Sequence, residues 1–217
     1  MVSVVILSNT ANNSIHRMTQ ECIDSIHATS DADVVVVEMN ANAVFDNAKV
    51  VRFDESFQFN KMLNIGINYC LEKWPHNEYI VLANNDLVFH NNWLEAMLPH
   101  FESYDSLSPK SPNWPTHNMM SHGIHEGWAI GKEFAGWCLV FKTDSLKMLL
   151  PLDEQFEFWC ADNDMTMEMQ KLEMRHALVM DSHVTHLFSK SHTLMDNVAH
   201  YTANQVHKFK NKWENKA

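Results

Sequence analysis

The sequence predicts a single α/β domain, built on a mixed, mainly parallel sheet with helices on both faces. Short runs rich in β-branched residues alternate with segments of helical periodicity, an order typical of βαβ units. The short runs are almost continuously apolar, as expected of strands that are covered on both faces. At 217 residues, the chain is long enough to bury roughly 70% of its unfolded surface around one core.

The first half of the chain carries the clearest alternation. Four strands are predicted, at Val2 to Leu7, Val34 to Glu38, Val50 to Phe53 and Tyr79 to Ala83. Ser14 to Ala28 and Phe59 to Lys73 place apolar residues three and four positions apart, so each predicts a helix with one buried face. A further helix is predicted to begin near Asn92. Parallel strands joined in this way end at a common edge, where open α/β sheets bind their ligands.

The alternation breaks between Ser106 and Trp128, where three prolines stand among Asn, Ser and His residues. A segment of this length without periodicity predicts an irregular, mobile lid or binding loop. His117, His122 and His125 lie within it, but their spacing matches no usual zinc site and no cysteine joins them. We therefore expect these histidines to line the loop.

Regular structure is predicted to resume after this loop. The predicted elements are a strand at Trp137 to Lys142, helices at Thr143 to Leu150 and Ala161 to Met174, and a strand at His176 to Met180. Near the C-terminus, one helical face carries Val198, Thr202, Val206, Phe209 and Trp213. This amphipathic pattern predicts a C-terminal helix that docks on the body.

Composition narrows the function classes. A net charge of −11 argues against a strongly nucleic-acid-binding surface, because Lys and Arg supply most of that affinity. No apolar run approaches the ~20 residues of a membrane span, and the N-terminus lacks the basic region of a signal peptide. The four cysteines, Cys22, Cys70, Cys138 and Cys160, are widely spaced among apolar neighbours. We expect buried free thiols and a cytoplasmic protein.

The most informative segment is an apolar strand that runs directly into Asn84, Asn85 and Asp86. A divalent cation that must also bind a diphosphate needs open coordination positions, so one or two carboxylates at the end of a rigid strand suit it. An Asn/Asp turn that only ends the strand is the alternative interpretation of the triplet alone.

Several sequence patterns occur in an order that resembles the inverting GT-A glycosyltransferases of glycosyltransferase family 2. The resemblance covers about residues 2 to 191 and depends on the order and spacing of the patterns. They are SVVILSNT at Ser3 to Thr10, VVVVEMN at Val34 to Asn40, FNKMLNIGI at Phe59 to Ile67, the triplet ending at Asp86, GWCLVFKTD from Gly136, Ala161 to Asp164, and Met180 to His186.

The resemblance implies a GT-A fold and a metal-dependent inverting transfer of a monosaccharide from a nucleotide diphosphate sugar, with UDP as the carrier, to a hydroxyl acceptor. It implies a nucleotide-sugar-binding half at residues 1–90 and an acceptor-side half at 91–191. Residues 192–217, which carry the predicted C-terminal helix, would form a helical tail. The donor-binding residues would be Ser8, Thr10, Glu38, Lys61, Asn85 and Gly136. A lone lysine such as Lys61 is also typical of a solvated helix face.

Asp86 and His186 are the metal ligands that the resemblance implies for Mn²⁺ or Mg²⁺, although His186 could equally be a histidine at the surface or the core edge. The catalytic candidates are Asp162, as the base that deprotonates the acceptor, and Asp164, which would hold the acceptor or orient its partner. The family usually has an acidic residue where Ala161 stands, so the choice between the two carboxylates stays open. Both could also serve only to stabilise a helix N-terminus.

Three alternative functions remain at this level. The same enzyme could act on a hydroxylated base in DNA, which a lysine-rich tail carrying Lys208, Lys210, Lys212 and Lys216 weakly favours. A nucleotidyltransferase would need a glycine-rich loop after the first strand, and residues 8–13 contain no glycine. A non-catalytic nucleotide- or glycan-binding module would tolerate the loss of both Asp86 and Asp162.

Overall fold

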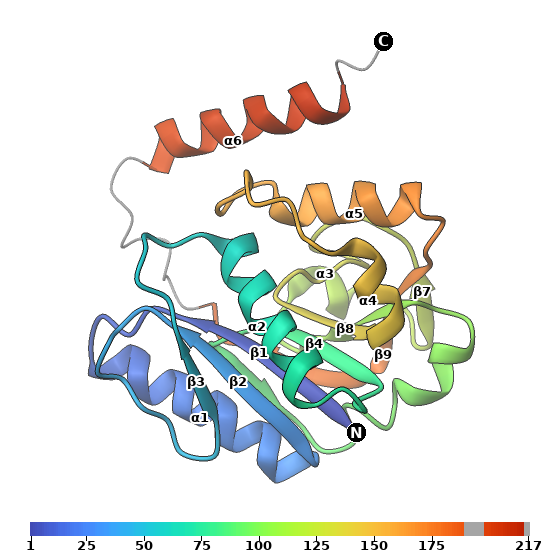
Figure 1. Cartoon of the computed structure of the whole chain (residues 1–217). Coiled ribbons are helices and arrows are strands. Elements are labelled where there is room, and N and C mark those ends of the chain that lie inside the picture. The colour runs from blue at the N-terminus through green and yellow to red at the C-terminus, as the bar shows by residue number, and fades with distance from the viewer. Residues whose placement is uncertain (189–197, 215–217) are drawn as a thin grey trace.

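A nine-stranded sheet in the order β3-β2-β1-β4-β8-β6-β9-β5, with β7 beside β9, runs through the computed structural model (Figure 1). The structure describes residues 1–188 and 198–214. The strands are β1 (Val2–Ser8), β2 (Ala32–Glu38), β3 (Lys49–Arg52), β4 (Tyr79–Asn84), β5 (Leu87–Phe89), β6 (Ser106–Lys110), β7 (Ile124–Glu126), β8 (Cys138–Lys142) and β9 (His176–His186). The helices are α1 (Asn13–Thr29), α2 (Phe59–Lys73), α3 (Pro115–Asn118), α4 (Thr143–Leu149), α5 (Ala161–Lys171) and α6 (Val198–Trp213), with a 3₁₀ helix, η1 (Leu98–Glu102).

The predicted fold class is confirmed. β1, β2, β3 and β4 are mutually parallel, β8 enters antiparallel to β4, and β6 and β9 again run in the direction of β4. Only the short β5 and β7 join β8 in the opposite direction. The sheet is therefore mixed and mainly parallel.

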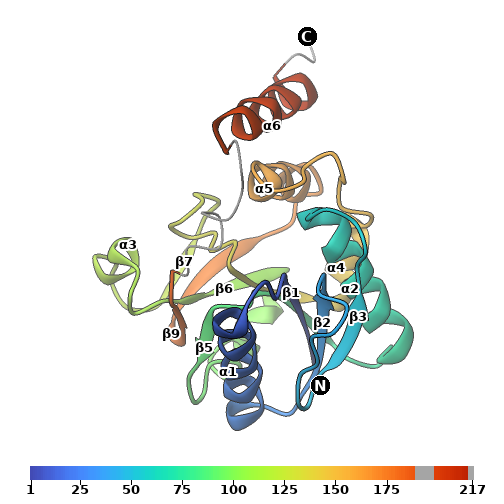
Figure 2. The same cartoon turned by 90° about the vertical axis from the view of Figure 1, so that its left-hand side faces the viewer.

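Side chains of alternate residues in β1 pack into two separate cores, one on each face of the sheet. Val4 and Ile6 pack in the core that α1 covers, whereas Val5 and Leu7 pack in the core that α2, α4 and α5 cover. This alternation follows from the two-residue period of a strand. Figure 2 shows α1 on one side of β1 and β2 and α2 on the other. Because helices cover both faces of the sheet, the strands consist of almost continuous apolar residues.

The prediction of an irregular loop at residues 106–128 is wrong for much of its length. β6 lies inside the sheet between β8 and β9, and Ser106, Leu107 and Ser108 are fully buried. Pro109 is tolerated there because β6 pairs with β8 only through its first two residues. His117 is also buried: its Nδ1 accepts from Ser111 N at 3.0 Å, and its Nε2 lies 2.8 Å from Lys132 O.

Two further predictions need correction. Residues 91–97 form turns that lead into η1 and not an α-helix, because Asn92 has a φ of 66° and Pro99 has no N–H to donate. β9 continues to His186, well past Met180, and its second half alternates between buried and exposed residues, as a strand with one solvated face does. His186 therefore ends the strand itself.

The predicted C-terminal helix forms and docks, and part of the predicted apolar face takes part in the contact: Phe209 packs against Phe156, and Trp213 Nε1 donates to Asp164 Oδ1. Val206 is exposed, whereas Gln205 is fully buried and Lys212 is largely covered. Figures 1 and 2 both show α6 lying over α5. The docked face thus combines aromatic side chains with polar and cationic ones. In the described part of the chain, no helix is long and apolar enough to span a membrane.

Candidate active site

The carboxyl ends of β1, β2 and β4 bring three polar side chains to one edge of the sheet. Ser8 lies beside Glu38 in the register of β1 and β2, and Leu7 lies beside Asn84 in the register of β1 and β4. The parallel arrangement that the sequence predicted therefore brings these side chains together at the strand ends.

The Glu38 carboxylate is fully buried and organises the turn that follows β1. It accepts hydrogen bonds from Thr10 N at 2.9 Å, from Thr10 Oγ1 at 2.7 Å and from Asn40 N at 2.7 Å. A buried carboxylate needs such donors to offset the loss of water. The structure thus brings Glu38 and Thr10 together, with the carboxylate engaged in shaping the turn.

Ser8 and Asn85 are linked by a residue of α1, Thr19. The hydroxyl of Ser8 lies 3.3 Å from the hydroxyls of both Thr10 and Thr19, and Asn85 Nδ2 donates to Thr19 Oγ1 at 3.0 Å. These contacts link β1, α1 and the end of β4. Lys61 is not part of this group, since its ammonium is bound by Glu55 at 2.7 Å near the exposed start of α2.

Asp86 and His186 are brought together from segments a hundred residues apart. Residues Leu87 and His186 are register partners in the antiparallel pair of β5 and β9, and Leu187 N donates to Asp86 O at 2.9 Å. As a result, His186 Nε2 lies 3.3 Å from Asp86 Oδ2, with both side chains largely buried.

Two indole rings stack on the His186 ring. The ring of Trp137 stacks on it at 5.3 Å with an interplanar angle of 16°, and that of Trp114 lies at 6.0 Å and 20°. Stacking restrains the rotation of the imidazole so that Nε2 keeps facing Asp86. The Nδ1 atom is buried without a hydrogen-bond partner among the described residues.

The Asp86–His186 pair fits a divalent metal. Ligand atoms at neighbouring corners of an octahedron lie about 3 Å apart when each is about 2.1 Å from the ion, close to the separation of these two atoms. Within residues 1–188 and 198–214, no third His, Cys, Asp or Glu completes a closed cluster. The remaining positions of such a site are suited to phosphate and water oxygens.

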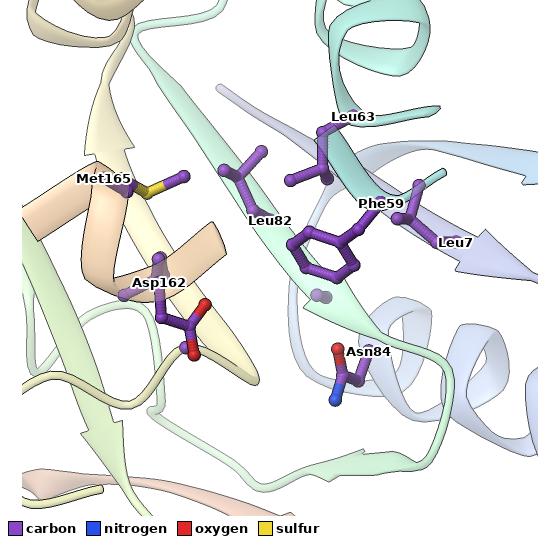
Figure 3. A pocket seen from close by; sticks show the side chains of 10 residues that line it. Leu7, Phe59, Leu63, Leu82, Asn84, Asp162 and Met165 are labelled. Atoms are coloured by element: carbon purple, nitrogen blue, oxygen red, sulfur yellow. The ribbon is translucent and has the colours of Figure 1, made fainter. Parts of the chain in front are cut away.

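Asp162 lines a hollow at the same edge of the sheet. It lies in the first turn of α5, and a Cβ atom added at Gly136 would collide with its carboxylate. Figure 3 shows Asp162 on one wall of the hollow, with Asn84 and Phe59 across from it. Gly136 therefore provides the space in which this carboxylate lies.

The chemistry of Asp162 suits a general base. Its side chain is partly exposed, yet desolvation of the carboxylate raises its pKa from 3.8 to about 6. None of the described residues donates a hydrogen bond to it, so it is available to a ligand. Asp164 points the other way: its Oδ1 lies 2.7 Å from Lys212 Nζ and accepts from Trp213 Nε1 at 2.8 Å.

Two features of the site were missed from the sequence. Asn84 lines the hollow beside Asp162, while only its neighbour Asn85 was proposed to contact the donor. The alternation of β4, in which Leu82 faces the same core as α5, was the available signal. The stacking of Trp114 on His186 had no such signal, because Trp114 belongs to the segment predicted as a loop.

The raised pKa of Asp162 has a measurable cost in stability. The folded state binds this proton more tightly than the unfolded chain does. The favourable contribution of the bound proton to the free energy of unfolding is therefore complete below pH 3.8 and is lost as pH rises through about 6. Asp162→Asn is therefore expected to raise the free energy of unfolding at pH 8 by about 1–3 kcal/mol, with little gain at pH 3.5. Urea unfolding at both pH values measures this. Asp144→Asn, which alters a highly exposed carboxylate, should give no comparable gain.

No protein-family model matches the chain, and no curated protein matches it. Among solved structures, the chain is similar to the crystal structure of GalNAc-T7 with UDP, GalNAc and Mn²⁺, with a TM-score of 0.68 and 12% sequence identity. The match covers 88% of this chain and 44% of the GalNAc-T7 chain, so this chain spans less than half the length of that protein. A likeness at this identity establishes the fold: the chain has the GT-A fold that the sequence predicted.

Proposed function

We propose that this protein is a metal-dependent inverting glycosyltransferase that moves a monosaccharide from a UDP-sugar to a hydroxyl acceptor. The observation that carries the proposal is the placement of two functional groups at one edge of the sheet. The Asp86–His186 pair follows β4, and the Asp162 carboxylate lies beside Gly136 and Asn84, the last residue of the same strand. A metal-diphosphate site and a base are the two parts that this transfer needs.

The donor would lie across the ends of β1, β2 and β4. Ser8, Thr10 and Asn85 line this edge, with Glu38 fixing the turn that carries Thr10. When bound to Asp86 and His186, a divalent metal would supply positive charge that stabilises the diphosphate leaving group. UDP and Mn²⁺ in the GalNAc-T7 structure support the choice of nucleotide and metal.

Asp162 would take the proton of the acceptor hydroxyl as that oxygen attacks the anomeric carbon. The bond from the sugar to the diphosphate breaks as the new glycosidic bond forms, and a single displacement of this kind inverts the anomeric configuration. A carboxylate with a pKa of about 6 is mostly ionised at neutral pH and is a better proton acceptor than an ordinary aspartate. Gly136 would contribute by leaving room for this carboxylate.

The lysine-rich tail supports a hydroxylated DNA base as the acceptor less than its sequence suggested. Lys208 donates to Gln155 O at 3.0 Å and lies 3.3 Å from Glu157, and Lys212 is engaged by three carboxylates. Two lysines of the tail therefore bind the protein itself, which leaves fewer cations for phosphates. Lys216 lies outside the described residues. We propose a glycan or small-molecule hydroxyl as the acceptor.

Nucleotide-dependent stabilisation tests the proposal directly. UDP is expected to raise the melting temperature only when Mn²⁺ or Mg²⁺ is present, because the metal joins the diphosphate to Asp86 and His186. A ligand at 100 times its Kd adds about 2.7 kcal/mol to the free energy of unfolding. A thermal-shift screen of nucleoside diphosphates with each metal, and with EDTA as the control, measures this. Metal-independent binding, or no binding of any nucleotide, would contradict the proposal.

A further inference from the structure

Lys212 of the C-terminal helix forms the densest ionic contact in the described structure. Its ammonium lies 2.7 Å from Asp164 Oδ1, 2.9 Å from Asp153 Oδ2 and 3.1 Å from Glu168 Oε1, and its side chain is 18% exposed. Burial lowers the pKa of this lysine, but the hydrogen bonds with Asp164 and Asp153 outweigh that effect and raise it overall. One cation thus joins three carboxylates from two segments of the body.

Two of these carboxylates belong to α5, the helix that carries Asp162. Asp164 and Glu168 are four residues apart, so they lie on one face of α5, one turn from each other. Asp162 precedes Asp164 by two positions, or about 200° around the helix. The carboxylate of Asp162 therefore faces Gly136 while the opposite face of the same turn is bound to α6.

The segment that leads into α5 is also attached to α6. Gln205 Oε1 accepts a hydrogen bond from Glu157 N at 3.1 Å, and Lys208 donates to Gln155 O at 3.0 Å. Phe209 packs against Phe156 in an edge-to-face arrangement, with ring centroids 6.4 Å apart. The same helix, α6, thus contacts both α5 and the segment that precedes it.

We propose that Lys212 and Trp213 are positioning residues for Asp162: by binding Asp164 and Glu168, they set the rotation of α5 that aims the Asp162 carboxylate at the hollow beside Gly136. Neither residue is proposed to touch substrate. A helix held at two points one turn apart cannot rotate about its axis without breaking an ion pair. The inference rests on the proposed role of Asp162 as the base.

The need for such a support follows from the geometry of proton transfer. A base must hold its carboxylate within about 0.5 Å and 10–20° of the productive position, and a misplacement of about 1 Å can reduce the rate by about 10²-fold. Cys160, which begins α5, has a left-handed φ of 63° and no side-chain cap, so the start of the helix lacks its usual stabilisation. The ion pairs to α6 supply the restraint from outside the helix.

Lys212→Met tests the proposal, with Lys210→Met as the matched control. Lys210 lies about half a helical turn from Lys212, is exposed and forms no ion pair among the described residues. The first readout is the pKa of Asp162, measured by NMR of its carboxyl carbon as the pH is changed. Lys212→Met should lower it from about 6 toward 3.8, by about one unit or more, as the carboxylate leaves its desolvated position. Lys212→Arg should largely restore the wild-type value, and Lys210→Met should not change it.

The second readout is the reaction of Cys160 with a thiol reagent. Cys22, Cys70 and Cys138 are buried and Cys160 is partly exposed, so the early phase of labelling reports on the start of α5. Lys212→Met should accelerate this phase severalfold. If Lys212→Met does not fold, Trp213→Phe removes the indole N–H that donates to Asp164 and should produce smaller changes in the same direction.

The kinetic readout separates this inference from the proposed function. In an active enzyme, Lys212→Met should lower kcat by about tenfold or more with KM for the donor unchanged, since the metal pair is untouched. A folded Lys212→Met with wild-type Asp162 pKa, Cys160 labelling and kcat would overturn the inference. If the pKa and labelling respond as expected but the wild type transfers no sugar, the positioning of Asp162 by α6 stands and the proposed function fails.

Discussion

Asp162→Asn is expected to lower turnover by about 10²–10⁴-fold while leaving donor affinity nearly unchanged. Asparagine keeps the size of the side chain beside Gly136 but cannot accept the proton of the acceptor hydroxyl. The measurement is the rate of UDP release from a UDP-sugar that stabilises the protein, with a hydroxyl acceptor present. Product NMR should show that the wild type inverts the anomeric configuration.

The pH dependence of the wild type provides a second check on the same residue. The base acts in its ionised form, so turnover should rise as pH increases through about 6 and level off above it. Asp164→Asn is the matched comparison, because Asp164 is two positions away and faces α6; turnover should fall by about tenfold at most. Wild-type turnover in Asp162→Asn together with an inactive Asp164→Asn would show that Asp164 is the base. Activity in both variants would exclude this mechanism.

Asp86→Ala is expected to abolish most of the stabilisation that UDP gives in the presence of Mn²⁺. If the Kd rises about 100-fold, a ligand that contributed about 2.7 kcal/mol contributes only about 0.4 kcal/mol. His186→Ala should weaken the effect less, because Asp86 and the phosphate oxygens still bind the ion. Thermal shifts of each variant, with UDP and Mn²⁺ together and each alone, measure the loss.

The controls for the metal site come from the same strand. Asp181 and His183 are exposed residues of β9, and their replacement by alanine should leave the metal-dependent shift intact. An undiminished shift in Asp86→Ala would remove Asp86 from the site. If the shift disappears in His183→Ala but persists in His186→Ala, the histidine ligand is His183, and the prediction of His186 is wrong.

The elements of the first half could be predicted because their signals are local. The apolar runs of β1, β2 and β4 and the periodicity of α1 and α2 lie within short windows of sequence, and the structure reproduces them within two residues. The order of these elements also determines that polar residues such as Ser8 and Glu38 meet at one edge. A strand that is buried on both faces needs only to be apolar along its length, and this property can be seen in the sequence without knowing its neighbours.

β6 could not be predicted in this way because distant residues satisfy its polar groups. Ser106 Oγ lies 2.6 Å from His176 Nδ1, and Ser108 Oγ lies 3.2 Å from His176 Nε2. These partners are about seventy residues apart in the chain. Buried serines and a proline look like a loop until the histidine that pairs with them is known.

The sequence by itself determined the class of fold and the set of candidate residues, and only the tertiary structure separated their roles. Asp162 and Asp164 are almost indistinguishable in sequence, since both are aspartates in the first turn of one helix. In the structure, Gly136 lies against one and Lys212 against the other. The physical reason is that a carboxylate takes its function from the groups around it. Desolvation raises the pKa of both carboxylates, but an ion pair holds Asp164 to α6, whereas Asp162 is available to a ligand.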